Sequence, residues 1–130
     1  MKKDIDFEPV KNVTVSIIRN GENDWQVYLI NRSKERLETI LVTSKGYGNK
    51  NGESQKTSLL RHSIPFLDSG MHALIEPISP DVFHLTNEYW VSYYIGSKIF
   101  DKKFIFVPDT IIEKNLTFIP ELDAQGVLHD

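Results

Sequence analysis

The chain has 130 residues, of which 40% are hydrophobic and 25% charged, and its formal net charge at pH 7 is -3. These ordinary values argue against intrinsic disorder and a fibrous repeat, and they favour one globular domain spanning residues 1–130. The slightly acidic balance and the lack of a dense Lys/Arg block argue against binding to nucleic acid.

The sequence contains no cysteine. Disulfide bonds, thiolate catalysis and cysteine-ligated zinc are therefore excluded, and the composition fits a reducing compartment. The first residues, MKKDIDFEPV, lack an apolar stretch after the lysines, and no apolar run in the chain is long enough to cross a membrane. We expect a cytoplasmic protein without membrane contact, while noting that a signal peptide removed before residue 1 would leave no trace.

Alternating hydrophobic residues predict three strands in the first third of the chain. Residues 13–17 alternate Val and Ile with Thr and Ser, the pattern of a half-buried strand. Residues 25–31 carry apolar side chains of both parities, so we expect that strand to be buried on both faces. A charged connection leads to a third strand over residues 37–45.

The middle of the chain is rich in turn-forming residues. Residues 48–54 have no hydrophobic side chain and two glycines, which predicts an exposed, flexible loop directly after Tyr47. A strand is expected from about residue 56 to residue 64, where Pro65 should end it. Another strand is expected over residues 71–78.

Residues 87–107 predict a β-hairpin that turns at Gly96-Ser97, because aromatic and β-branched residues fill both arms. Pairing Ile95 with Lys98 fixes the register of the whole hairpin. One parity of side chains should then face the core: Tyr89, Val91, Tyr93, Phe100, Lys102 and Phe104. The opposite face is too apolar for free exposure to water, so we expect it to be covered.

The last segment, residues 109–130, has a different pattern. Thr110 and Glu113 have capping-box spacing and predict one helical turn, after which scattered apolar residues follow. We expect this segment to cover the outer side of the hairpin sheet, over Trp90, Tyr94, Ile99, Tyr28 and Ile30. A subunit partner on that face is the alternative.

Seven short strands with turn signals between them, and no helical periodicity before residue 108, predict an all-β fold. We expect an antiparallel β-sandwich of immunoglobulin or fibronectin type, with the C-terminal segment 109–130 packed on one sheet. A small barrel is the alternative, since strand counting does not distinguish closure from stacking.

No catalytic or cofactor motif is present in the sequence, so we predict neither an enzymatic activity nor a cofactor. Four histidines lie too far apart in sequence to form a metal motif. Arg61 and His62 are adjacent on a predicted strand, so one of them should face inward. We favour a buried polar partner for that residue over an anion-binding role.

Three aromatic residues are the remaining binding candidates. Trp90 and Tyr94 share the outer face of the hairpin, where such side chains can stack on sugars or on a protein partner. Tyr47 lies between two glycines at a strand exit. The candidate ligand- or partner-binding set is therefore Trp90, Tyr94, Tyr47, Arg61 and His62.

The segments VYLINR, LVTSKGYG, KTSLLRH, LIEPI, NEYWVSYY and KKFIFVP, in this order, resemble a family of short uncharacterised bacterial proteins. Some members of that family carry the label phenylalanyl-tRNA synthetase alpha subunit. The resemblance covers nearly the whole chain and implies no catalytic residues. The synthetase label would imply a far longer class II core with an arginine-bearing motif that grips ATP. The chain has four arginines, none after a glycine-rich strand, so we interpret the label as a transferred one.

From these observations we expect a non-enzymatic protein-interaction module that binds a protein partner or itself. A domain that binds a small ligand or carbohydrate is the alternative, and a synthetase-related protein ranks below both.

Overall fold

The computed structural model describes residues 9–130; residues 1–8 of the expected domain lie outside the described part. Strands dominate, and the only helical turns among residues 9–130 are three short 3₁₀ helices. The strands are β1 (Val13–Arg19), β2 (Trp25–Asn31), β3 (Leu37–Lys50), β4 (Glu53–Lys56), β5 (Leu60–Leu67), β6 (His72–Ile78), β7 (Thr86–Ile95), β8 (Lys98–Phe106), β9 (Thr117–Ile119) and β10 (Ala124–His129). The 3₁₀ helices are η1 (Pro80–Val82), η2 (Glu113–Asn115) and η3 (Pro120–Leu122).

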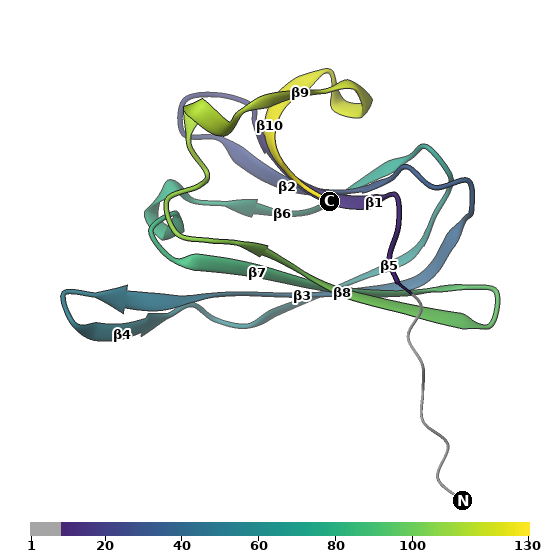
Figure 1. Ribbon diagram of the computed structural model, residues 1–130, viewed down its shortest axis with the longest axis horizontal. Helices are drawn as coiled ribbons and strands as arrows, with labels where there is room; N and C mark the ends of the chain where they lie inside the picture. The colour runs from purple at the N-terminus through teal and green to yellow at the C-terminus, as the bar shows by residue number, and fades with distance from the viewer. Residues whose placement is uncertain (1–8) are drawn as a thin grey trace, which may run out of the picture.

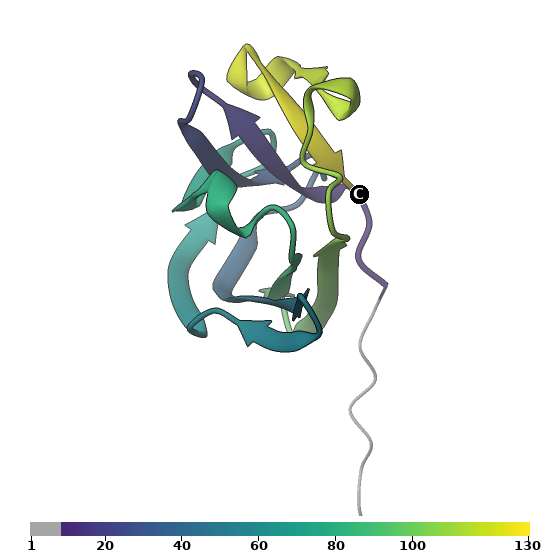
Figure 2. The same cartoon turned by 90° about the vertical axis from the view of Figure 1, so that its left-hand side faces the viewer.

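Two five-stranded antiparallel sheets stack face to face, which confirms the predicted all-β sandwich. The upper sheet in Figure 1 has the order β6-β2-β1-β10-β9. The lower sheet has the order β4-β3-β7-β8, and β5 pairs with the first half of β3 on the edge that β4 uses further along. Figure 2 shows the same two layers from the end, with the C-terminal strands at the top of the upper layer.

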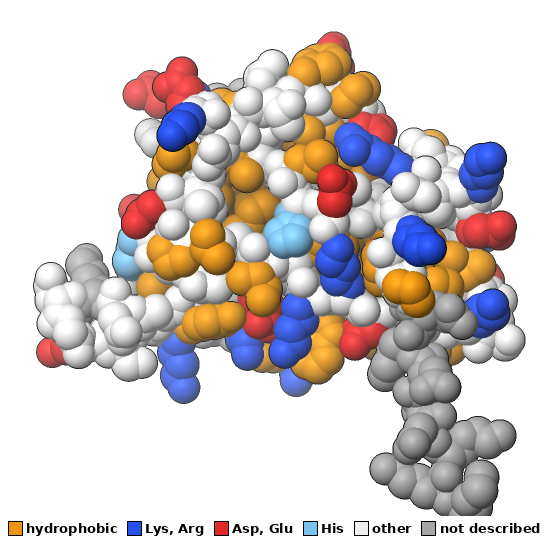
Figure 3. Space-filling model, in the orientation of Figure 1, with side chains coloured by type: hydrophobic (Ala, Val, Ile, Leu, Met, Phe, Trp, Pro, Cys, Tyr) orange, Lys and Arg blue, Asp and Glu red, His pale blue; other side chains and the backbone are white. Residues whose placement is uncertain are grey.

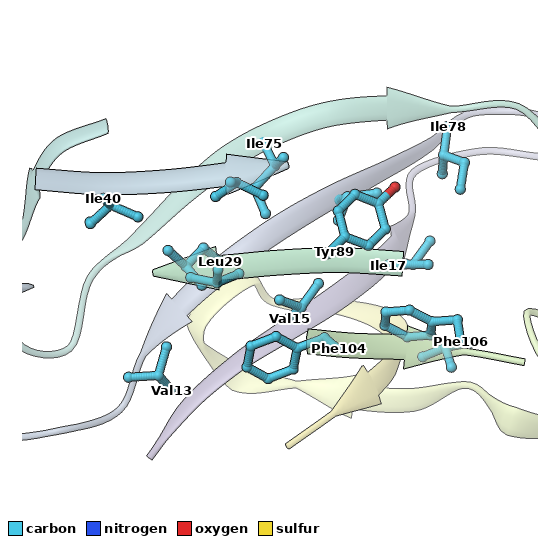
Figure 4. Close-up of a cluster of buried hydrophobic side chains, with 14 of the residues drawn as sticks. Val13, Val15, Ile17, Leu29, Ile40, Ile75, Ile78, Tyr89, Phe104 and Phe106 are labelled. Carbon is cyan, nitrogen blue, oxygen red and sulfur yellow. The ribbon is translucent and has the colours of Figure 1, made fainter. Parts of the chain in front are cut away.

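The core lies between the two sheets. Val15, Ile17 and Leu29 of the upper sheet and Tyr89 and Phe104 of the lower sheet belong to one cluster of buried side chains (Figure 4). None of these side chains is more than 2% exposed. Burial of this apolar area, at about 25 cal/mol per Å², is the main force that holds the two layers together.

The β7–β8 hairpin has the predicted register. Ile95 lies opposite Lys98, and Tyr93 opposite Phe100. Gly96 has φ 60, whereas Ser97 has no positive φ, the combination typical of a type II′ turn. The inner parity is confirmed as the core face, because Tyr89, Val91 and Tyr93 are all buried.

The prediction of a loop over residues 48–54 was wrong. Strand β3 continues through Tyr47 to Lys50, and β4 returns along it. Asn51 and Gly52 have φ 53 and 81, as a type I′ hairpin turn requires. Tyr47 is therefore a strand residue and does not lie in a loop.

The strand expected over residues 56–64 is shifted toward the C-terminus. Strand β5 spans Leu60–Leu67 and runs through Pro65. Because β5 pairs only with β3, it is an edge strand, and an edge position tolerates a residue without a backbone N–H.

The C-terminal segment does not cover the outer side of the hairpin sheet, so that part of the prediction was wrong. Instead β10 pairs with the free edge of β1 and extends the upper sheet. A second small core of Ile18, Ile30 and Ile119 forms there, with Tyr28 packed against it. The expected cover over Ile30 and Tyr28 is thus present, whereas Trp90, Tyr94 and Ile99 belong to the other sheet.

The predicted helical turn also differs. Thr110 does not cap a helix; its hydroxyl donates to the carbonyl of Val107, and η2 begins three residues later at Glu113. Within residues 9–130 no helix has the length and apolar character that a membrane crossing requires.

Candidate functional site

Four of the five predicted site residues lie on one surface, the outward side of the lower sheet. Antiparallel partners share a face, so the pairing of Thr43 with both Trp90 and Arg61 places these residues in one row across three strands. Tyr94 lies two pairs away along β7. We call this surface the outer face; it includes Glu38, Leu41, Thr43, Lys45 and Tyr47 of β3, Arg61, Ser63 and Phe66 of β5, Glu88, Trp90, Ser92 and Tyr94 of β7, and Ile99, Asp101, Lys103 and Ile105 of β8.

Trp90 lies at the centre of the outer face and is 43% exposed. Its indole Nε1 donates a hydrogen bond to Oδ1 of Asp101, and the ammonium of Lys103 lies 4.6 Å from the ring centroid. These two contacts fix the ring orientation from two sides. The side chain is therefore held in place while much of its apolar surface stays in water.

A shallow groove of about 510 Å³ runs from Trp90 to Tyr94, which is 39% exposed. Its walls combine aromatic and aliphatic surface with hydroxyl and carboxylate groups. They are formed by Thr39, Leu41, Thr43, Trp90, Ser92, Tyr93, Tyr94, Ile99 and Asp101. Hydrophobic side chains lie among basic and acidic ones along the lower border of the space-filling view, where the outer face is seen edge-on (Figure 3).

Tyr47 lies at the β4 end of the outer face. Its hydroxyl donates to Oε1 of Glu88 at 3.3 Å, and Lys45 Nζ lies 3.8 Å from Oε2 of the same carboxylate. Burial, followed by the negative charge of Glu88, raises the pKa of Tyr47 above its ordinary value. Glu88 is only 5% exposed, so these contacts satisfy a carboxylate that the sheet largely shields from water.

Charge is divided along the strands of the outer face. Arg61 and Lys103 lie in the same row as Trp90, and Lys45 lies in the next row toward β4, opposite the acidic Glu88. Asp101 and Glu38 lie on the side toward the Gly96 turn. The outer face thus has a basic half and an acidic half, with Trp90 beside the boundary.

His62 does not share this surface. It pairs with Val42 and faces the interior, where its Nε2 lies 2.7 Å from Oε1 of Glu76 on the edge strand of the other sheet. The expectation that one residue of the Arg61-His62 pair faces a polar partner inside is confirmed. Arg61 points outward.

A second candidate site is a cavity of about 210 Å³ at the open edge between the sheets, and Glu76 is the residue to which two of its polar side chains hydrogen-bond. Ser44 donates its hydroxyl to Oε1 at 2.8 Å, and Tyr89 donates to Oε2 at 3.0 Å. Burial, followed by the charge of Glu76, strongly raises the pKa of Tyr89. The carboxylate therefore meets two hydroxyl donors and one imidazole.

A β-bulge explains why this carboxylate points inward. Ala73 pairs with Leu29 and Leu74 with Tyr28, but Val27 pairs with Glu76, so one residue of β6 is extra. The bulge turns Glu76 toward the core side that strict alternation would give to its neighbour. The cluster of Glu76, Ser44 and Tyr89 was not predicted from the sequence. Three separate strands supply these residues, and nothing in the local pattern marks a bulge.

The chemistry of this cavity is that of a structural hydrogen-bond network. Ser44 and His62 both contact the same oxygen of Glu76, so the hydroxyl donates to a carboxylate and not to an imidazole. A Ser-His-acid relay needs the imidazole between the other two groups. The volume is also below the range of about 300–1,000 Å³ typical of ligand pockets.

The remaining histidines have separate local partners. His84 contacts Gln55, His72 packs edge-on against Tyr28, and His129 packs between Phe104 and Phe106. In the described part of the chain, no three His, Asp or Glu side chains gather closely enough to hold a metal ion.

Comparison with known proteins identifies no relative. No protein-family model, no curated protein and no solved structure matches the chain. The function is therefore inferred from the geometry of the outer face and of the Glu76 cavity.

Proposed function

We propose that the protein is a non-enzymatic interaction module and that the outer face is its contact surface for another protein chain. The observation that supports this most strongly is the exposure of Trp90 at the centre of a sheet. The C-terminal segment, which the sequence offered as a cover, pairs with β1 instead. No described element lies beyond the lower layer (Figure 1).

The composition of the outer face supports a protein partner. Trp, Tyr and Arg are enriched at protein interfaces, and hot spots cluster near the centre of such a surface. Here Trp90 and Tyr94 lie on either side of the row that contains Ser92 and Leu41, and Arg61 lies in the same row as Trp90. Ring orientation is fixed before binding, so little side-chain entropy remains to be lost on contact.

Site-specific photo-crosslinking tests this function. Tyr94 is replaced by a photoreactive phenylalanine derivative in the full chain, and Phe118, an exposed aromatic on β9 of the other sheet, is replaced as the matched control. We expect protein adducts from position 94 and none from position 118. Absence of any protein adduct at position 94 would contradict the proposal.

A second candidate function is carbohydrate or small-ligand binding. The groove between Trp90 and Tyr94 favours it, because about 510 Å³ lies within the range of ligand pockets and Thr43, Ser92 and Asp101 offer polar groups. Titration with oligosaccharides, monitored by the fluorescence of Trp90, would detect it. A saturable change that the Trp90→Phe variant lacks would favour this function over protein contact.

We also propose kinship with immunoglobulin-like sandwiches. The order β1-β2-β6 facing β3-β7-β8 supports it, since strands A, B and E face C, F and G in that fold. A different strand order would contradict it.

A cytoplasmic location is proposed from the absence of cysteine and can be tested by cell fractionation.

A further inference from the structure

We infer that the occupant of the outer face is a second copy of this chain, packed sheet on sheet with its strands reversed. This inference rests on the proposed function, because it names the partner of the same surface. It makes the contact isologous: each residue pair across the two-fold axis occurs twice.

The division of charge selects the reversed arrangement. A two-fold axis parallel to the strands would place basic half over basic half. An axis across the strands, between the rows of Trp90 and Ser92, places Lys103 of each copy opposite Asp101 of the other. The same operation brings Lys45 toward Glu38 of the other copy. Opposite charges then meet both beside the axis and toward the ends of the surface, which is the complementarity that specific interfaces show.

The apolar residues fit the same arrangement. Trp90 lies next to the axis, so the two indoles come together at the centre of the interface, with Leu41 and Thr43 on one side. Sheets that pack face to face lie about 10 Å apart, and side chains from the two faces interdigitate across that distance. The face is large enough for a contact and bears Trp90 and Leu41 beside the axis.

The area of the outer face sets the expected affinity of the dimer. Four strands spaced about 4.8 Å apart, with about eight residues each, give a plan area of roughly 500 Å². A stable complex buries about 800 Å² per partner. The dimer should therefore be reversible, with a dissociation constant roughly in the micromolar to tens-of-micromolar range.

Charge exchange within one strand tests the inference. Sedimentation velocity of the full chain is measured over a concentration series for the wild type, Lys103→Asp, Asp101→Lys and the double variant. Each single change sets like charges against each other twice per dimer, so self-association should weaken by about tenfold or more. The double variant restores opposite charges across the axis and should associate within a few-fold of the wild type. Lys114→Asp, an exposed change in η2 away from the outer face, should have no effect.

Four results would overturn the inference. The wild type could stay monomeric at several hundred micromolar, or the double variant could fail to regain association although it melts like the wild type. A third contradicting result would be that Trp90 becomes more exposed when residues 1–8 are removed. That result would assign the outer face to the chain's own N-terminal segment. Adducts from position 94 with a protein of different mass would leave the proposed function in place while excluding a second copy.

Discussion

The indole of Trp90 donates its hydrogen bond to Asp101, which is the strand partner of Ser92 and not of Trp90. The bond runs diagonally across the hairpin and holds the ring over the groove between Trp90 and Tyr94. On the opposite side Lys103, the direct partner of Trp90, places its ammonium over the ring. An exposed tryptophan held by two strands is a rigid contact point, and the outer face is organised around it.

Substitutions on the two faces of strand β7 should differ in their effect on stability: those on the outer face should matter little, and those on the core face should matter much more. We expect Trp90→Thr to change the free energy of unfolding by less than about 1 kcal/mol, because 43% of Trp90 is already exposed to water in the folded protein. Val91→Ala, at the next residue but fully buried, should cost about 2 kcal/mol. Urea unfolding of both variants measures the difference. A larger loss for Trp90→Thr would mean that Trp90 holds the fold together.

The Glu76 network should stabilise the open edge of the sandwich. Glu76→Gln replaces a carboxylate that meets Ser44, His62 and Tyr89, and should cost roughly 2–3 kcal/mol. Tyr89→Phe should cost about 1–2 kcal/mol. In a double-mutant cycle the two losses should be clearly less than additive, because the residues share one hydrogen bond. Additive losses would show that the contact contributes nothing.

Alkaline pH should weaken the fold through buried tyrosines. Burial raises the pKa of Tyr93 from 10.0 to about 12, so the unfolded chain loses this proton first. The contribution of Tyr93 to stability is therefore complete below pH 10 and is lost as pH rises to about 12. Tyr93→Phe should reduce the slope of stability against pH in this range. An unchanged slope in chemical unfolding at pH 9–12 would contradict the assignment.

Gly126 should be essential for attachment of the C-terminal strand. A Cβ at this position would lie 2.6 Å from Cδ1 of Ile18 and 2.9 Å from the carbonyl oxygen of Ile17. Gly126→Ala should therefore destabilise the protein by roughly 1–3 kcal/mol. Gly21→Ala, where the nearest atom lies at 3.7 Å, is the matched control. Equal melting temperatures for the two variants would argue against the β1–β10 pairing.

The sequence predicts those parts of the fold where local patterns decide the outcome. The register of the β7–β8 hairpin follows from the Gly96-Ser97 turn and from strict alternation on both arms. The β3–β4 hairpin was also marked locally, by Asn51-Gly52, but its arms are polar and were mistaken for a loop. Turn chemistry was the stronger signal there.

Other features depend on long-range contacts. The C-terminal segment pairs with the edge of β1 because that edge offers both unpaired backbone groups and the apolar surface of Ile18 and Ile30. No local pattern distinguishes that edge from the outer face. The inward turn of Glu76 depends on a bulge in one strand relative to another, so it too was hidden from periodicity.

Fluorescence quenching of the wild-type protein tests whether a second copy covers the outer face. The chain has two tryptophans; Trp25 is buried at 7% exposure, so iodide quenching reports on Trp90. The Trp90→Phe variant, which retains only Trp25, supplies the background signal. If a second copy covers the outer face, quenching of Trp90 should be strong in dilute solution and should fall as concentration rises through the dimerisation range. Equally strong quenching at every concentration would contradict a dimer formed through this face.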